Sequence, residues 1–185
     1  MSTAANVSAA KPKIGGAISY APVGTTLPTD AVSELNEAFT SLGYISEDGF
    51  KNSSSITSNK VKAWGGDVVL VVQSDSSDEC SFTLIESTNP DVLKAVHGEG
   101  NVTGTIDTGI TVKVNSAAHE NFAWVIDMVL KGGAVKRIVL PSAAISSVDE
   151  VSYNDTSAIG YAIKLTATAD AGGNTHYEYI KSKTS

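Results

Sequence analysis

Alternation of apolar residues with other residues is the feature that most constrains how this chain can fold. Residues 122–130, FAWVIDMVL, place five apolar side chains on one face of an extended chain, and residues 159–169 repeat the pattern. Shorter runs of the same kind are CSFTL at 80–84 and ITVKV at 110–114. A period of two is typical of half-buried β-strands. The run DVVLVVQ, residues 67–73, is apolar without alternation, so we expect a strand that is covered on both faces.

Two segments have the periodicity and end signals of helices. The first predicted helix spans residues 30–42, where apolar residues recur every three or four positions and Gly43 follows the last of them. The second spans residues 89–98, where Pro90 suits the first turn and Gly98 can end the helix. We therefore expect one longer helix and one short helix.

Glycine-rich turns separate the later strands. Residues 131–133, Lys-Gly-Gly, predict a tight hairpin, and residues 171–174, AGGN, predict a turn before the last strand. Two helices among roughly eight to ten strands predict a mainly β fold. The expected architecture is a β-sandwich or barrel with one flanking α-helix and a second short helix.

The predicted domain organisation is simple. Residues 1–13 are small, polar and without pattern, which indicates a flexible N-terminal arm, and residues 14–185 are expected to form a single β-sandwich domain. This domain includes an extended loop at about 48–64, which is polar, rich in serine and ends in Trp64. Long connections in compact domains are commonly either functional or disordered.

The charge balance disfavours a nucleic-acid-binding protein. The chain carries 20 Asp and Glu against 13 Lys and Arg, whereas a groove that binds phosphates needs positive charge. Cys80 is the single cysteine and lies in a strand-like run, so we expect a buried thiol and no disulfide within the chain. No run is typical of a secretory signal or approaches the roughly 18 apolar residues of a membrane helix. We therefore expect a protein that is made in a cytoplasm and contacts no membrane.

Motifs for catalysis and metal binding are scarce. His97, His119 and His176 lie far apart in the sequence, without the short spacing that is typical of zinc ligands. His97 is expected near the C-terminal end of its helix, where positive charge is favourable. The glycines of residues 97–104 fit no phosphate-loop spacing and are interpreted as turn residues. With no GxSxG or SxxK motif, we expect no enzyme activity, no cofactor and no metal.

One acidic cluster has two interpretations. Residues 74–79, SDSSDE, lack the spacing of a calcium-binding loop. The cluster is either a solvated turn or a wall of negative charge within an assembly. The carboxylates concerned are Asp75, Asp78 and Glu79.

Three segments, taken in order, carry a resemblance to a known family: LPTDAVSELNEAFTSLGYISEDGF at 27–50, VKAWGGDVV at 61–69 and SFTLIESTNPDVLKAVHGEGNV at 81–102. Over roughly residues 15–140 the chain resembles the major tail tube proteins of long, non-contractile-tailed bacteriophages (siphoviruses), above all those that infect actinobacteria. The tubes of contractile tails and of type VI secretion share this general architecture, but the KAWGGD segment favours the non-contractile phages.

The resemblance implies a structural virion protein that is assembled in the host cytoplasm. Such proteins form hexameric rings, which stack into the tube through which the genome leaves the capsid. The expected partners are further copies of the chain, the tape measure protein in the lumen, and the tail terminator and distal tail or tip proteins. Phage DNA is expected to pass through without specific binding, along a lumen whose negative charge would come from Asp75, Asp78 and Glu79.

In this family the long loop projects and packs on the adjacent ring, which implies a set of residues at the interface between subunits. A large aromatic such as Trp64 is well suited to anchor such a contact, either at the base of the loop or in the joint between subunits, although it could also pack in its own core. The interface candidates are Phe50, Lys51, Asn52, Ser53, Ser54, Ser55, Ile56, Thr57, Lys60 and Trp64.

A different function, that of a monomeric β-sandwich binding module for carbohydrates or surfaces, remains as an alternative. It requires exposed aromatic residues gathered on one face. Tyr177 and Tyr179, together with His176, are the residues that point in this direction.

Overall fold

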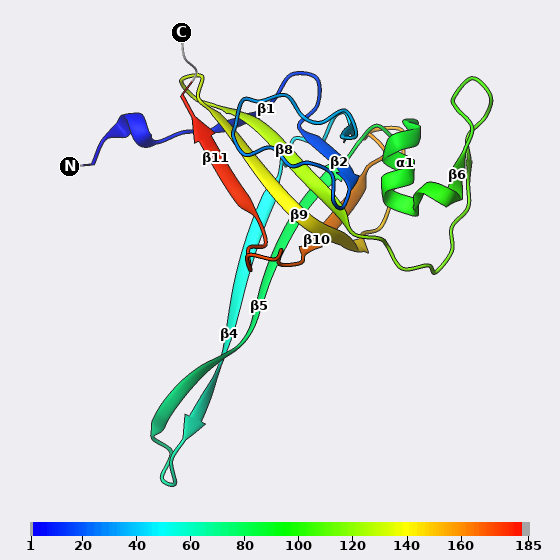
Figure 1. Cartoon of the computed structure of the whole chain (residues 1–185). Coiled ribbons are helices and arrows are strands. Elements are labelled where there is room, and N and C mark those ends of the chain that lie inside the picture. The colour runs from blue at the N-terminus through cyan, green and yellow to red at the C-terminus, as the bar shows by residue number, and fades with distance from the viewer. Residues whose placement is uncertain (1, 183–185) are drawn as a thin grey trace.

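The fold is built on one antiparallel sheet of nine strands, which the computed structural model shows within the described residues 2–182 (Figure 1). The strand order is β3-β2-β8-β9-β10-β5-β4, while β1 also pairs with β8 and β11 also pairs with β9. The strands of this sheet are β1 (Ala10–Pro12), β2 (Ile18–Pro22), β3 (Thr40–Ser41), β4 (Lys51–Lys62), β5 (Val68–Leu84), β8 (Phe122–Leu130), β9 (Val135–Val148), β10 (Tyr161–Ala167) and β11 (Tyr177–Lys181).

Smaller elements complete the chain. Two short strands, β6 (Val102–Thr103) and β7 (Thr111–Val112), form a separate sheet. The α-helix α1 spans Pro90–His97, and two 3₁₀ turns span Ala4–Asn6 and Glu99–Asn101. The mainly β prediction is therefore confirmed.

The alternating runs at 80–84, 122–130 and 159–169 form strands of the large sheet over most of their length, whereas the strand predicted at 110–114 is reduced to Thr111–Val112 and leaves Val114 exposed. Residues 122–130 become β8, and the turn at 131–133 joins β8 to β9, with the Leu130 amide donating to the Ala134 carbonyl at 2.7 Å. Gly132 and Gly133 both have positive φ, the conformation that such a hairpin turn requires. The turn at 171–174 precedes the last strand, but β11 pairs with β9 and not with β10.

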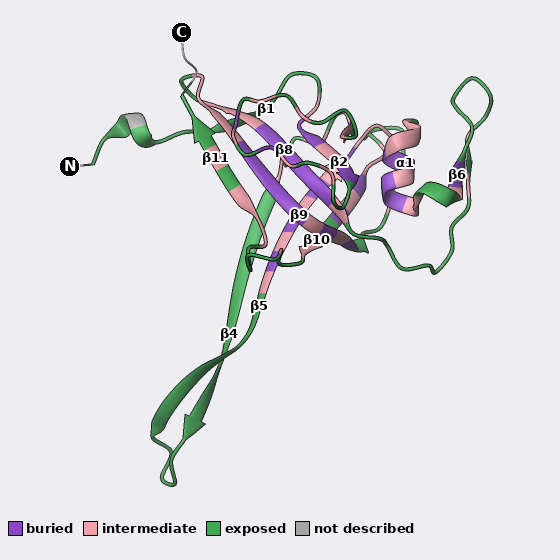
Figure 2. Cartoon of the chain, viewed as in Figure 1, coloured by how far each residue is buried: buried purple, intermediate pink, exposed green. Residues whose placement is uncertain are grey.

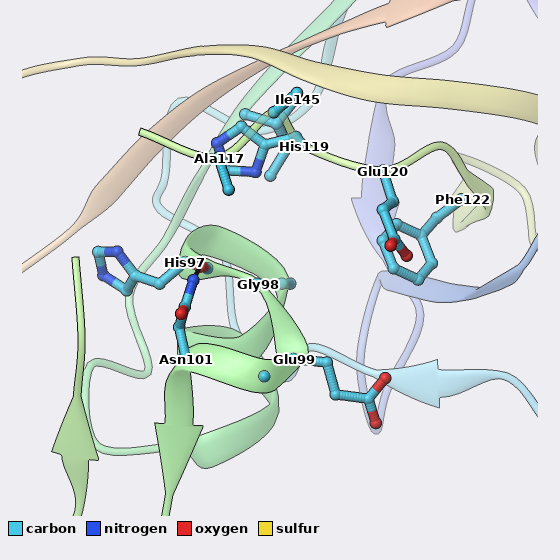
Figure 3. A pocket seen from close by; sticks show the side chains of 12 residues that line it. His97, Gly98, Glu99, Asn101, Ala117, His119, Glu120, Phe122 and Ile145 are labelled. Atoms are coloured by element: carbon cyan, nitrogen blue, oxygen red, sulfur yellow. Dashed lines mark hydrogen bonds between the residues drawn. The ribbon is translucent and has the colours of Figure 1, made fainter. Parts of the chain in front are cut away.

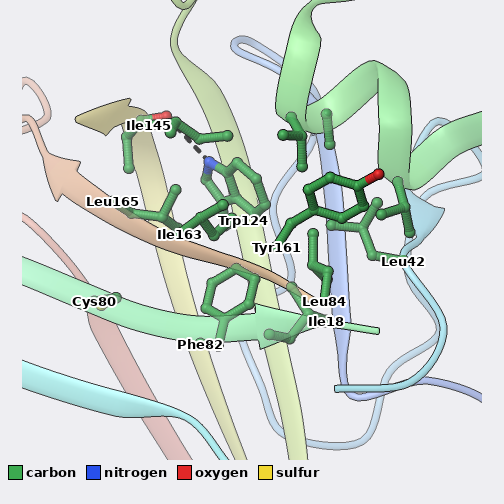
Figure 4. Close-up of a cluster of buried hydrophobic side chains, with 14 of the residues drawn as sticks. Ile18, Leu42, Cys80, Phe82, Leu84, Trp124, Ile145, Tyr161, Ile163 and Leu165 are labelled. Atoms are coloured by element: carbon green, nitrogen blue, oxygen red, sulfur yellow. Dashed lines mark hydrogen bonds between the residues drawn. The ribbon is translucent and has the colours of Figure 1, made fainter. Parts of the chain in front are cut away.

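The sheet curls so strongly that its two halves enclose the core in the manner of a β-sandwich. Phe82 of β5 and Trp124 of β8 lie on strands that are not neighbours in the sheet, yet their ring centroids are 6.1 Å apart (Figure 4). The indole nitrogen of Trp124 donates to the Ala143 carbonyl at 3.0 Å, so its polar atom is satisfied inside the core. The helix α1 covers this core with Val92 and Val96, which are both buried.

The prediction of the short helix is confirmed, and the prediction of the longer helix is wrong. The side chain of Asn89 accepts a hydrogen bond from the Asp91 amide at 3.0 Å, which caps α1 as its sequence predicts. Residues 30–39, by contrast, form bends and turns without any α-helix. The α-helix that accompanies the sheet is therefore the short one.

Tertiary hydrogen bonds explain why residues 30–42 form no helix. The Asp30 carboxylate accepts from the amides of Val32 and Ser33 at 2.7 and 2.6 Å, which folds the chain into a tight turn. The carbonyls of Asp30 and Ser33 accept from Arg137 Nη1 at 3.1 and 3.0 Å. In a helix these carbonyls would instead accept from amides four residues further on. The guanidinium of Arg137 thus replaces a helical hydrogen-bond pattern.

Arg137 and Asp127 form a buried ion pair between β8 and β9. They are direct cross-strand partners, and Arg137 Nε and Nη2 donate to the two Asp127 carboxylate oxygens at 2.6 and 3.1 Å. Lys13 Nζ adds a third contact to Asp127 at 3.3 Å. Removing one member of a buried pair is costly, because the other charge stays buried without compensation.

We predict that Arg137→Ala lowers the free energy of unfolding by about 3–5 kcal/mol, since Asp127 loses two of its three hydrogen bonds and two loop carbonyls lose their partner. Urea unfolding followed by circular dichroism measures the loss. The matched control is Lys136→Ala in the same strand, because Lys136 pairs with Glu178 at the surface at 2.8 Å. This control should lose no more than about 1 kcal/mol. An equal loss in both variants would contradict a special role for the buried pair.

Candidate interaction surface

A long β-hairpin projects from the body of the molecule. β4 pairs with β5 along its whole length, from Lys51 opposite Ser81 to Lys62 opposite Val68. Every residue from 51 to 76 is exposed (Figure 2), and we call this segment the projecting hairpin. The loop predicted at about 48–64 is therefore wrong as secondary structure, since most of it is strand β4. The alternation signal is missing because neither face of β4 is buried against the chain's own core.

Trp64 sits at the tip of the projecting hairpin, with 107% relative exposure. The turn that carries it is closed by two hydrogen bonds, from the Ala63 amide to the Asp67 carbonyl at 2.8 Å and from the Gly66 amide to the Ala63 carbonyl at 3.0 Å. Gly65 and Gly66 both have positive φ, which side-chain-bearing residues rarely adopt. Packing of Trp64 in its own core is thus excluded, and so is a place at the base of the hairpin.

The projecting hairpin is apolar on both faces near its tip. Val68 to Val72 are between 46% and 62% exposed, and successive side chains of this run point to opposite faces. The prediction that residues 67–73 are covered on both faces is wrong for the single chain. This segment lies beyond the body of the molecule, where β5 pairs with β4 alone, and its side chains on both faces are exposed in the described chain.

The interface candidates of the sequence occupy different places on this hairpin. Residues 51–57 and Lys60 lie on β4, where Ser55 and Ser77 hydroxyls meet across the strands at 3.2 Å. Phe50 is half-buried at the base, and its ring stacks on Phe82 at 6.1 Å. Sequence reasoning missed the exposed valines and the leucine of residues 68–72 as contact residues, although their unbroken apolar run was visible.

A clasp of hydrogen bonds holds the base of the projecting hairpin. The carboxylate of Asp78, which is 4% exposed, accepts from the Ser54 hydroxyl of β4 at 3.1 Å and from the Thr175 hydroxyl at 2.7 Å. It also pairs with His176 Nδ1. Thr175 and His176 immediately precede β11, so the clasp ties the hairpin to β11, which pairs with the same edge of β9 as β10 does.

Several opposing effects set the pKa of Asp78. Burial raises the pKa, but the hydrogen bonds from Thr175 and His176, the charge of His176 and the Ser54 hydroxyl together hold it below its ordinary value.

The other two carboxylates of the acidic cluster have different surroundings. Asp75 is exposed, and Glu79 lies 3.5 Å from Lys164 Nζ. All three belong to β5, so the interpretation of residues 74–79 as a turn is wrong.

The histidines that are distant in sequence are partly brought together. His97, at the end of α1, and His119 line a cavity of about 380 Å³ (Figure 3). Burial, and to a smaller extent the charge of His119, lowers the pKa of His97. Among residues 2–182 no group of three or more His, Cys, Asp or Glu side chains is arranged to hold a metal ion. The predicted position of His97 at the helix end is confirmed.

One further expectation concerns the burial of Cys80. Cys80 is buried as predicted, and burial, followed by the charge of Asp78, raises the pKa of its thiol to about 12.

Tyr177 and Tyr179 stack in parallel with ring centroids 6.3 Å apart, while the Tyr177 hydroxyl donates a hydrogen bond to Asp170 at 2.5 Å. No helix in the described part of the chain is both long and apolar enough to cross a membrane.

The fold and this surface define a mainly β protein with an exposed apolar hairpin. The family model described as phage tail tube protein matches residues 4–185, so the chain belongs to the phage tail tube protein family. It therefore has a structural role in the tail tube of a virion, and the resemblance to tail tube proteins is confirmed at this level. A comparison with curated proteins found no match.

The clasp predicts a pH-dependent contribution to stability. A carboxylate whose pKa is lowered by folding contributes stability above its unfolded pKa of about 3.9, and this contribution is lost as the pH falls through the lower folded pKa. Wild-type chain and Asp78→Asn should therefore differ in free energy of unfolding by about 1.5–3 kcal/mol near pH 6, and the gap should shrink below about pH 4. Urea unfolding at pH values from 6 to 2 measures it.

Asp75→Asn is the matched control, because Asp75 is an exposed carboxylate of the same strand. It should change the free energy of unfolding by no more than about 0.5 kcal/mol across this range. A pH-independent gap between wild type and Asp78→Asn would show that the clasp does not depend on the carboxylate charge.

Proposed function

We propose that this protein polymerises as stacked hexameric rings that form the tail tube of a siphovirus infecting an actinobacterium. The tube is the conduit for genome ejection, and assembly takes place in the host cytoplasm. Its partners are further copies of the chain, the tape measure protein in the lumen, and the tail terminator and distal tail or tip proteins. Membership of the phage tail tube protein family supports the structural role in the tail tube. The hexameric ring and its partners go beyond this role and are part of the proposal.

The single observation that carries the proposal is the projecting hairpin with apolar side chains on both faces. Fully burying a valine or leucine side chain is worth about 1.5–3 kcal/mol, so an exposed run of five such residues favours association strongly. Exposed patches of this kind mark contacts with other proteins. The free backbone edge of β5 at residues 68–76 adds hydrogen-bonding groups that another strand can satisfy.

The shape of the subunit suits a head-to-tail assembly. The hairpin lies at one end of the molecule, and the described residues form no second hairpin of this length at the other end (Figure 1). A surface that meets a different surface on the next copy makes a heterologous contact, which closes into rings or continues as a filament. Within a ring such contacts close on six subunits, and between rings they leave the stack open-ended.

The charge of the chain agrees with a channel through which DNA slides. A net charge of −7 repels phosphates in general, which disfavours tight binding of the genome. Of the three proposed lumen charges, Asp75 has the most accessible carboxylate, Glu79 lies near Lys164, and Asp78 is engaged in the clasp. Asp75 is therefore the strongest candidate for a residue that faces the genome.

We predict that the purified chain, concentrated and incubated, forms hollow tubes of constant diameter or stacked six-fold rings in negative-stain electron microscopy. The physical reason is the apolar hairpin, which gains its cover from neighbouring copies. Small particles under all conditions, including addition of preformed tail tips, would count against self-assembly and favour a monomeric binding module.

A shortened hairpin should separate folding from assembly. Replacing residues 56–76 by Asn-Gly joins the paired residues Ser55 and Ser77 through a two-residue turn and removes the apolar segment. We expect a monomer with nearly unchanged circular dichroism and unfolding midpoint that forms no tubes. Trp64→Ala should also remain folded and assemble poorly, because Trp64 makes no contact with the core. Normal tubes from the shortened chain would contradict a role of the hairpin in assembly.

A further inference from the structure

A cavity at the end of the molecule opposite the hairpin tip has the chemistry of a receptor for an aromatic side chain. Its volume is about 510 Å³, within the range of sites that bind small ligands. Its apolar lining includes Val32, Met128, Val129 and Val135. We call it the end pocket.

The position of the end pocket follows from the strand register. β11 begins beside the clasp at the base of the projecting hairpin and ends at Lys181, which lines the pocket and pairs with Val135. Figure 1 shows β11 running away from the hairpin tip toward the opposite end of the molecule. β4 alone extends over 12 residues, roughly 40 Å at about 3.3 Å per residue. Trp64 therefore lies far from the end pocket of its own chain.

We infer that the end pocket of one copy receives Trp64 from the hairpin tip of the next copy. This inference rests on the proposed head-to-tail stacking and names the two surfaces that meet. Trp64 is held on a hydrogen-bonded turn, so its ring is presented in a defined place before contact, which lowers the entropy cost of binding. The pocket and the tip lie at opposite ends, and each contact therefore leaves a free tip and a free pocket for further copies.

The side chains around the pocket match what an indole needs. Lys13 and Lys181 supply cations that can lie over the ring face, and the Met128 thioether makes favourable contacts with aromatic rings. Asp127 also lines the pocket. Among the described residues its oxygens accept three hydrogen bonds, two from Arg137 and one from Lys13, whereas a carboxylate has about four acceptor positions. The remaining position can accept the indole N–H of Trp64.

A charge pair between Asp67 and a pocket lysine supports the same pairing. The tip carries the exposed Asp67 three residues after Trp64, while the exposed Lys62 lies two residues before Trp64. Lys13, with 55% of its side chain exposed, and Lys181 line the pocket that receives the tip. Val32 is 52% exposed beside this pocket, an apolar residue without full cover in the single chain.

Cysteine cross-linking within assembled tubes tests the pairing while Trp64 stays in place. The double variant Ala63→Cys/Val32→Cys places one thiol beside Trp64 and one in the pocket lining, and native Cys80 is buried and does not compete. Oxidation with copper–phenanthroline forms a disulfide only if the two Cα atoms come within about 7 Å. We expect a ladder of covalent multimers on a denaturing gel, because each copy links to the next one.

The matched control is Ala63→Cys/Tyr153→Cys, since Tyr153 is 74% exposed and lies outside the pocket lining. It should give no ladder. Tubes in which the Val32 pair gives no ladder, or in which both pairs give one, overturn the inference but leave the proposed tube intact. Failure of the wild-type chain to form any tube counts against the proposed function and removes the second copy as the occupant of the pocket.

A charge in the pocket provides a second readout. Val32→Asp changes an exposed side chain, so the monomer should keep its circular dichroism and urea midpoint. A carboxylate among the apolar side chains that would contact the indole should raise the critical concentration for tube formation by at least about tenfold, as loss of a central aromatic contact does. In wild-type tubes, Trp64 fluorescence should become protected from acrylamide quenching. An unchanged critical concentration together with a freely quenched Trp64 would overturn the inference.

Discussion

The buried ion pair of Asp127 and Arg137 is the interaction on which the arrangement of the body depends. It joins the two central strands, β8 and β9, and its guanidinium also holds the carbonyls of Asp30 and Ser33. The same carboxylate reaches Lys13, which ties the N-terminal segment to the sheet. One charged pair thus fixes a strand register, a loop and the approach of the N-terminal segment. A buried pair of this kind favours one arrangement of the strands, because any other arrangement would leave buried charges without partners.

The projecting hairpin follows a different logic from the body. In the body, aromatic side chains such as Phe82 and Trp124, together with the aliphatic side chains, pack against one another within the chain. In the hairpin, residues 68–72 have the composition of a buried strand and are exposed on both faces. Such exposed apolar residues contribute little to the stability of a single chain, whereas in an assembly they become buried. The clasp at Asp78 then acts as the mechanical link between a stable body and a segment shaped for contact.

Sequence reasoning succeeded where burial and periodicity coincide. The strand β10 and the capped helix α1 each bury one face, so their patterns were readable. The strand β8 and the hairpin turn after Leu130 were also predicted, although β8 is buried on both faces at 123–127. It failed at residues 30–42, where apolar spacing indicated a helix that Arg137 prevents by binding two carbonyls. It also failed at β4, whose polar residues have no buried face and therefore no alternation. Both errors concern segments whose structure is set by distant parts of the chain.

The sequence by itself determined the mainly β character, the positions of most core strands and the resemblance to tail tube proteins, because local patterns encode which side chains must avoid water. The tertiary structure decided which segments project. It alone placed Trp64 at a tip, closed the clasp between Asp78 and His176, and formed the end pocket from segments as distant as Val32 and Lys181. These features arise from contacts between residues far apart in the chain, which no local pattern records.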